Sequence, residues 1–156
     1  MKGQTEAGSK TVVLCVPLRA DDLVTVRLAL YGVAVRVGLS YEAIEDLKVA
    51  VTEACNYAIL QAGDREQLPM LRLVFTLRET ELQIRIGTDS PDVTFGEALR
   101  PVKLPQEGVE ALERLEDSPI GLYLLQALVD ELRLEPGGEG EGASEAIVLI
   151  KRLAAG

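Results

Sequence analysis

The stretch VTEACNYAI, residues 51–59, places an acid, an amide and a phenol in an otherwise apolar helical pattern. Glu53 and Tyr57 are four positions apart and share one face of a helix, whereas Asn56 is rotated by about 100° from Tyr57. A carboxylate can act as a general base, and an amide oxygen can bind magnesium. The stretch is therefore either part of a nucleotide site or a polar helix face in contact with solvent.

Two helices are expected to position these side chains. Apolar residues recur at steps of three and four over residues 22–37, where Asp21 or Asp22 can cap the helix. A second helix is predicted over residues 40–61, with Ser40 at its start. Its apolar stripe consists of Ile44, Leu47, Val51, Ala54, Cys55 and Ala58.

Three segments have the composition of strands. Residues 11–18 form a continuously apolar, β-branched run, which predicts a well-buried first strand. Residues 71–77 and 82–86 alternate between apolar and polar side chains and are joined by a short connection. They are expected to form an antiparallel hairpin with one buried face.

The second half of the chain begins with a long, proline-containing connection over residues 87–119, which is typical of a lid, a binding loop or a disordered segment. A third helix is predicted over 121–132, a strand over 132–135 and a closing strand over 145–153. The order of elements predicts an α+β fold, a two-layer sandwich with helices on one face of a mostly antiparallel sheet.

Composition limits the function classes. The 156 residues, 47% hydrophobic and 26% charged, predict one domain over residues 11–156 after a flexible N-terminus at 1–10. The apolar runs are shorter than the roughly 20 residues that cross a bilayer, so a cytoplasmic protein without a membrane segment is expected. The net charge of −9 disfavours direct binding to nucleic acid or to acidic membranes.

A zinc site and a disulfide are also disfavoured. The chain has no histidine, which argues against a zinc site built from its residues. Cys15 and Cys55 both stand in apolar surroundings, so they are interpreted as small core residues rather than as a disulfide.

Three stretches of this chain carry a resemblance to a known family. VPLRADDLVTVRLALYGVA, AIEDLKVAVTEAC and SPIGLYLLQALVDEL resemble the anti-sigma factor serine kinases of the RsbW type, within the GHKL superfamily of histidine-kinase-like ATPases. The resemblance extends from about residue 12 to residue 153, with the stretches in the family's order. It implies the GHKL sandwich, ATP and Mg²⁺ as cofactors, and a role in transcription regulation during stress response or sporulation. The implied partners are a sigma factor, an anti-anti-sigma protein of the STAS type and a second copy of the chain, and Arg27 falls where the family contacts the sigma factor.

The family's first ATP box is a helix with a glutamate and, four residues later, a magnesium-binding asparagine. Glu53 occupies the glutamate position, as the implied catalytic base, and Tyr57 stands where the asparagine belongs. A phenol is a poor magnesium ligand at neutral pH, because its pKa is about 10. Asn56 is one residue early and would bind magnesium only through a local distortion such as a π-bulge. Tyr57 is most simply a side chain that fills the nucleotide space.

The other two boxes also depart from the family. The second box is Asp-x-Gly, and here Thr88 takes the place of the aspartate that binds adenine, with Asp89 one position late. The third box is a glycine-rich helix start that receives phosphates, and here it keeps only Gly121, followed by Leu122.

Two function classes follow from these changes. The first is an anti-sigma regulatory factor that sequesters a sigma factor by surface contacts, is controlled by an anti-anti-sigma partner and has weakened or lost ATP binding. The alternative is an active ATP-dependent serine-protein kinase that phosphorylates the anti-anti-sigma factor, with Glu53 as the base for the serine hydroxyl. A sensor histidine kinase is disfavoured, because the chain has no phosphoacceptor histidine.

Overall fold

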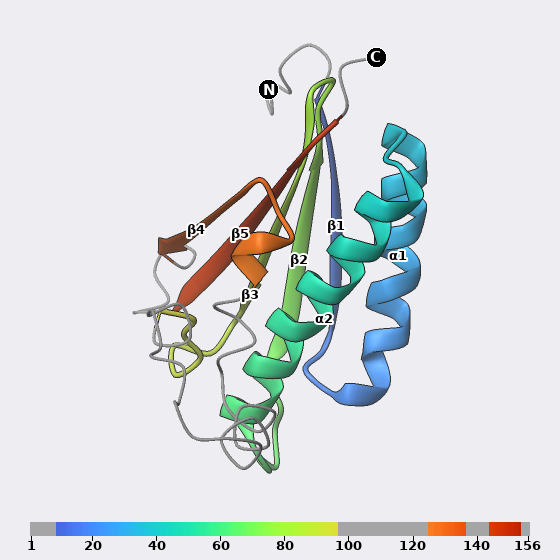
Figure 1. Ribbon diagram of the computed structural model, residues 1–156. Coiled ribbons are helices and arrows are strands. Elements are labelled where there is room, and N and C mark those ends of the chain that lie inside the picture. Colours follow the sequence, from blue (N-terminus) through green and yellow to red (C-terminus); the bar gives the residue numbers. More distant parts are fainter. Residues whose placement is uncertain (1–8, 97–124, 137–143, 154–156) are drawn as a thin grey trace, which may run out of the picture.

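The computed structural model describes residues 9–96, 125–136 and 144–153. Two helices, α1 (Leu23–Val37) and α2 (Tyr41–Ala62), lie on one face of a five-stranded sheet (Figure 1). The strands are β1 (Lys10–Pro17), β2 (Met70–Leu77), β3 (Glu81–Thr88), β4 (Glu131–Pro136) and β5 (Glu145–Arg152). They stand in the order β1-β2-β3-β5-β4, and every neighbouring pair is antiparallel. The predicted α+β sandwich is therefore confirmed.

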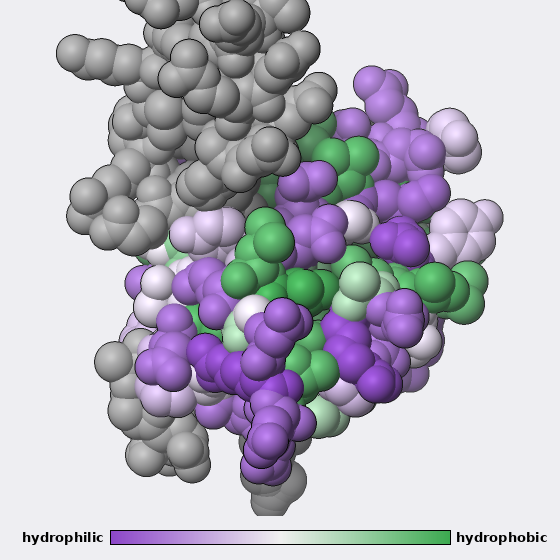
Figure 2. All heavy atoms as spheres, turned by 90° about the horizontal axis from the view of Figure 1, so that it is seen from below, coloured by the Kyte–Doolittle hydropathy of each residue, from purple (hydrophilic) through white to green (hydrophobic). Residues whose placement is uncertain are grey.

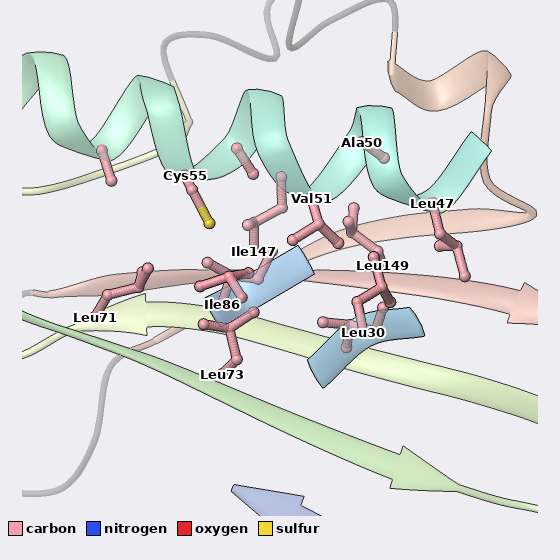
Figure 3. Packing of buried hydrophobic residues seen from close by; sticks show 14 of the residues in the cluster. Leu30, Leu47, Ala50, Val51, Cys55, Leu71, Leu73, Ile86, Ile147 and Leu149 are labelled. Carbon is pink, nitrogen blue, oxygen red and sulfur yellow. The ribbon is translucent and has the colours of Figure 1, made fainter. Parts of the chain in front are cut away.

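The core lies between the sheet and the two helices. β2 and β3 pair from Leu71 opposite Thr88 to Leu77 opposite Leu82, which confirms the predicted hairpin. Alternate side chains of this hairpin are buried, as period-two patterning requires. Figure 3 shows strand side chains such as Leu73 and Ile86 pointing toward Val51 and Cys55 of α2.

The helix boundaries agree with the sequence prediction, with one exception in the capping. The Ser40 hydroxyl accepts a hydrogen bond from the Ala43 amide at 3.1 Å and caps α2. Gly38 ends α1 in the left-handed region at φ 84°, which glycine adopts without steric cost. Asp22 occupies the N-cap position of α1, but its carboxylate binds Arg19 at 3.0 Å instead of capping the helix.

The prediction of a third helix is wrong for the part of this segment that the structure describes. Leu125–Ala127 is a short 3-10 turn, and the last two residues of the predicted helix belong to β4; residues 121–124 lie outside the described residues. The apolar spacing fits both structures, but Leu132 and Leu134 pair with Leu149 and Ile147 of β5. Pairing with a neighbouring strand overrides local helical preference here.

The first strand is present, but it is not buried on both faces. β1 is an edge strand, its Val13 side chain is 47% exposed, and Cys15 is exposed. The prediction that Cys15 is a core residue is therefore wrong, whereas Cys55 is buried as predicted. The reason is that both helices cover the opposite face of the sheet, so the side chains of β1 that point away from them have no helix above them in the described structure.

The remaining expectations on chain organisation are only partly covered by the structure. The predicted flexible N-terminus at 1–10 is described only at its last two residues, and Lys10 begins β1. Most of the connection predicted over 87–119 lies outside the described residues, from residue 97 onward. Among the helices that the structure describes, none combines the length and the apolar character needed to cross a membrane.

Candidate functional site

The acid, the amide and the phenol lie in the middle of α2. Glu53 is exposed, and its carboxylate makes no hydrogen bond or ion pair within the described part of the chain. Asn56 and Tyr57 are half-buried. Helix α2 is α-helical over its whole length, so the local distortion that would carry Asn56 into the position of Tyr57 is absent from this helix.

Tyr57 packs against an aromatic residue that follows β3. Its ring centroid lies 6.1 Å from that of Phe95, with an angle of 39° between the rings. Phe95 is completely buried, and so is Val93 two positions earlier. A tilted pair at this separation is a favourable aromatic contact. Tyr57, which is predicted to stand at the asparagine position of the first box, therefore packs against the core beside a buried residue from the segment after β3.

The backbone of residues 94–96, hereafter the 94–96 segment, is held from α2 by Gln61. The Gln61 side-chain amide donates to the Thr94 carbonyl at 2.6 Å, and its oxygen accepts from the Thr94 amide at 3.0 Å. Gln61 lies one helical turn after Tyr57. Both residues thus connect the 94–96 segment to the same end of α2.

Glu145, the first residue of β5, holds the same segment from the sheet. Its Oε1 atom accepts hydrogen bonds from the amides of Phe95 at 2.6 Å and Gly96 at 2.7 Å. Hydrogen bonds to an ionised acceptor are roughly twice as strong as neutral ones. Sequence reasoning missed Gln61, Phe95 and Glu145 as site residues. The available signal was Phe95, one of only two phenylalanines in the chain, standing in a polar connection.

The residues of the second box are engaged at the end of the β2–β3 hairpin. The Thr88 hydroxyl donates to the Ser90 carbonyl at 3.3 Å and accepts from the Ser90 amide at 3.1 Å. Asp89 pairs with Met70, because its Oδ1 atom accepts from the Met70 amide at 2.9 Å and its own amide donates to the Met70 carbonyl at 3.2 Å. The Asp89 carboxylate is therefore hydrogen-bonded to the first residue of β2.

Asp89 also borders a hollow of about 330 Å³ on the sheet. The other lining residues include Cys15, Arg72, Arg85 and Gly87, which alternate along their strands with the side chains that face the helices. The hollow is therefore on the face of the sheet opposite to α2. Asp89, one position late for the adenine box, is directed to this face rather than toward Tyr57. The third box, with Gly121 and Leu122, lies outside the described residues.

Arg27 lies on the side of α1 that faces α2. It is half-buried, and its positive charge acts on the Cys55 thiol. Burial raises the pKa of Cys55 to about 12, and the charge of Arg27 opposes this rise. In the described structure, Arg27 makes neither a hydrogen bond nor an ion pair with another side chain. Its guanidinium is available to a partner.

An apolar stripe runs along the outer surface of α1 beside Arg27. It consists of Val24, Leu28, Tyr31 and Val35, which are 55%, 67%, 54% and 52% exposed and are spaced by four, three and four residues. The inner face of α1 is also apolar, and the helix contains two arginines but no acid. A helix that is apolar on both faces is usually buried on both, so the outer stripe has the character of an interaction surface.

A second apolar area lies at the end of the molecule where β1 leads to α1 and α2 leads to β2. Figure 2 shows apolar surface in this view from below, bordered by hydrophilic residues. A hollow of about 440 Å³ at these connections is lined by apolar Leu18, Ile59 and Leu68 and by charged residues that include Arg19 and Arg65. The predicted nucleotide-binding residues that the structure describes, namely Glu53, Asn56, Tyr57, Thr88 and Asp89, do not line this hollow.

Comparison with known proteins gives two findings. Residues 16–143 match the family model of the histidine kinase-like ATPase domain. The chain is 33% identical over 119 residues to the serine-protein kinases RsbW of Bacillus thuringiensis strain Al Hakam and Bacillus cereus strain 03BB102. The aligned region covers 76% of this chain and 73% of each relative. A serine-protein kinase RsbW of Bacillus anthracis strain CDC 684 has the same identity over the same length.

Proposed function

Because this chain belongs to the histidine kinase-like ATPase family, among its RsbW-type members, we propose that it is an anti-sigma regulatory factor with weak or no ATP binding. It sequesters a sigma factor through surface contacts, and an anti-anti-sigma partner controls this binding. Regulation then depends on competition between partners rather than on phosphorylation.

The observation that carries this proposal is the contact between Tyr57 and Phe95. Tyr57 stands at the position of the magnesium-binding asparagine, and its ring lies 6.1 Å from that of a fully buried phenylalanine. A phenol at this place supplies no amide oxygen for magnesium. The residues of the first box therefore do not fit a magnesium nucleotide, and the ring contact favours a closed pocket.

The second box supports the same conclusion. Its aspartate position holds Thr88, and the neighbouring Asp89 carboxylate already accepts a hydrogen bond from Met70. The third box has lost a glycine next to Gly121, a change known from the sequence alone. If each lost contact costs about 1 to 3 kcal/mol, three together cost about 3 to 9 kcal/mol, which weakens a micromolar site to about 0.2 mM at the low end of this range and far beyond the millimolar range at the high end.

The sigma factor is proposed to bind α1. Arg27 is unpaired within the described residues and lies beside the exposed stripe that contains Leu28 and Tyr31. Since α1 has two arginines and no acid, the stripe suits a sigma-factor segment that presents apolar side chains flanked by carboxylates. Loss of a central arginine that binds a carboxylate should cost roughly 2 kcal/mol or more.

An alternative function, the active serine-protein kinase, is favoured by one observation. Glu53 is exposed, with its carboxylate unpaired in the part of the chain described, so it is available as a general base. Calorimetric titration with ATP and Mg²⁺ separates the two functions. We expect no saturation below millimolar ATP. A low-micromolar dissociation constant, together with phosphorylation of the anti-anti-sigma partner that is lost in Glu53→Ala, would establish the kinase instead.

The partner surface is tested with the purified cognate sigma factor. We expect Arg27→Ala to weaken binding by about 30-fold, which corresponds to roughly 2 kcal/mol. Arg36→Ala is the matched control, because Arg36 is an exposed arginine in the last turn of the same helix. Equal affinity of both variants and the parent chain, with unchanged circular dichroism, would remove Arg27 from the interface. Light scattering on Leu28→Glu shows whether the stripe instead joins two copies of the chain.

A further inference from the structure

Three cationic side chains from distant parts of the chain meet at the end of the sheet where the β2–β3 turn lies. Lys10 begins β1, Arg36 is in the last turn of α1, and Arg78 directly follows β2. All three line a hollow of about 320 Å³. The sequence contains no basic motif at these positions, so the cluster exists only because the fold assembles it.

The cations of this cluster lack partners. Within the described residues, none of the three side chains makes an ion pair or a hydrogen bond, and neither does Glu79, the one acid of the hollow. Among the described residues that line the hollow, three positive groups and one negative group give a formal charge of +2, in a chain whose net charge is −9. Elsewhere on the sheet Arg85 is paired with Glu135 at 3.1 Å and Arg133 with Glu131 at 3.0 Å, whereas Arg72 of β2 is a single arginine without a partner among the described residues.

Arg78 carries the clearest sign of a missing acceptor. Its Nε atom is buried and has no hydrogen-bond partner. The backbone fixes the residue in this place, because its amide donates to the Glu81 carbonyl at 3.0 Å across the β2–β3 turn. A buried donor without an acceptor is destabilising. An anion in the hollow would supply that acceptor.

We propose that this hollow binds a phosphate-type oxyanion through Arg78, Lys10 and Arg36. Guanidinium groups present parallel N–H donors that match two oxygens of a phosphate, and a lysine adds a mobile point charge. The hollow also includes Val37 and Leu77, whose apolar side chains strengthen electrostatic attraction nearby. A volume of about 320 Å³ is at the small end of ligand sites, so it suits a single phosphate group and its immediate attachment.

This inference does not depend on the proposed function. Arg78 and its neighbours line a different hollow from Thr88 and Asp89, the residues of the second ATP box. The terminal phosphate of a nucleotide would fit the cationic hollow without any recognition of adenine. Weak binding of ATP can therefore occur at the cationic hollow or at the predicted nucleotide site. Binding at the hollow is lost in Arg78→Gln, and binding at the nucleotide site is tested with Glu53→Ala.

The test is a titration of the ¹⁵N-labelled protein with inorganic phosphate at constant ionic strength, followed by amide chemical shifts. We expect saturable shifts at Lys10, Arg36, Arg78 and Glu79, with a dissociation constant in the millimolar range. Arg78→Gln should weaken binding at least tenfold. Arg72→Gln is the matched control, because Arg72 is an exposed arginine of β2 that also lacks a partner among the described residues and does not line this hollow.

Several outcomes decide the proposal. Shifts that do not saturate, or equal binding by Arg78→Gln and the parent chain, would overturn it. If Arg78→Gln fails to fold, Arg36→Gln replaces it, since Arg36 is exposed and its loss leaves the core unchanged. A parallel titration with O-phosphoserine distinguishes the source: tighter binding than that of inorganic phosphate supports a phosphorylated side chain as the ligand, and weaker binding supports free phosphate. Saturable shifts confined to other residues would refute the assignment while leaving the conclusion on ATP unaffected.

Discussion

The contact between Tyr57 and Phe95 predicts a measurable energetic coupling. Aromatic pairs contribute about 0.5–1.5 kcal/mol beyond the area they bury, at centroid separations of about 4.5–7 Å. This pair is 6.1 Å apart and tilted by 39°, toward the outer part of that range, so we expect a coupling of about 0.5–1 kcal/mol. Leucine substitutions keep apolar volume while removing the ring, and each should cost roughly 1–2 kcal/mol.

The assay is a double-mutant cycle of Tyr57→Leu, Phe95→Leu and the double variant, measured by urea unfolding. The double variant should lose less stability than the two single losses added together, by the coupling energy. A domain of this kind is stable by about 5–15 kcal/mol, so all three variants remain folded. Additivity within about 0.3 kcal/mol would refute the argument that the phenol stabilises the closed pocket through this ring.

Three further predictions concern Glu145 and the cysteines. Glu145→Gln should lower the unfolding free energy by about 2 kcal/mol, because the hydrogen bonds from the amides of Phe95 and Gly96 lose an ionised acceptor. Hydrogen exchange of these two amides should accelerate, and unchanged exchange would contradict the prediction. Burial raises the pKa of Cys55 from 9.0 to about 12, so only the unfolded chain releases this proton between these pH values. The contribution of Cys55 to stability should therefore be constant below pH 9 and fall by about 1.4 kcal/mol per pH unit between pH 9 and 12. In alkaline denaturation Cys55→Ala should remove this loss, and Cys15→Ala should retain it. In the native protein, iodoacetamide should modify the exposed Cys15 and leave Cys55 intact, and equal labelling by mass spectrometry would disprove the burial.

Both long helices and the central hairpin were predictable from sequence, because their signals are long and internally consistent. The hairpin alternates over both strands, and α2 combines an apolar stripe with a serine that caps it. Local preference and tertiary packing therefore agree in these elements, which is the condition under which a pattern determines structure.

The sequence predictions fail where the structure is decided by contacts with residues that are distant in the sequence. Leu125 and Val129 are spaced as in a helix and are both buried, yet the residues that follow pair with β5. The apolar run around Cys15 is the same whether a strand is covered on one face or on two. Only the position of the helices on the other face of the sheet shows that Cys15 is exposed.

The candidate site was predictable only in part, for a related reason. The sequence shows that a phenol replaces an amide at position 57, but the effect depends on Phe95, which reaches α2 only after the β2–β3 hairpin is complete. One hydrogen bond donated by Gln61, one accepted by it and two accepted by Glu145 hold the 94–96 segment independently of the ring. Tyr57 therefore accompanies a segment that is fixed against α2 from both layers of the sandwich. The position of this segment does not rest on the Tyr57 side chain alone.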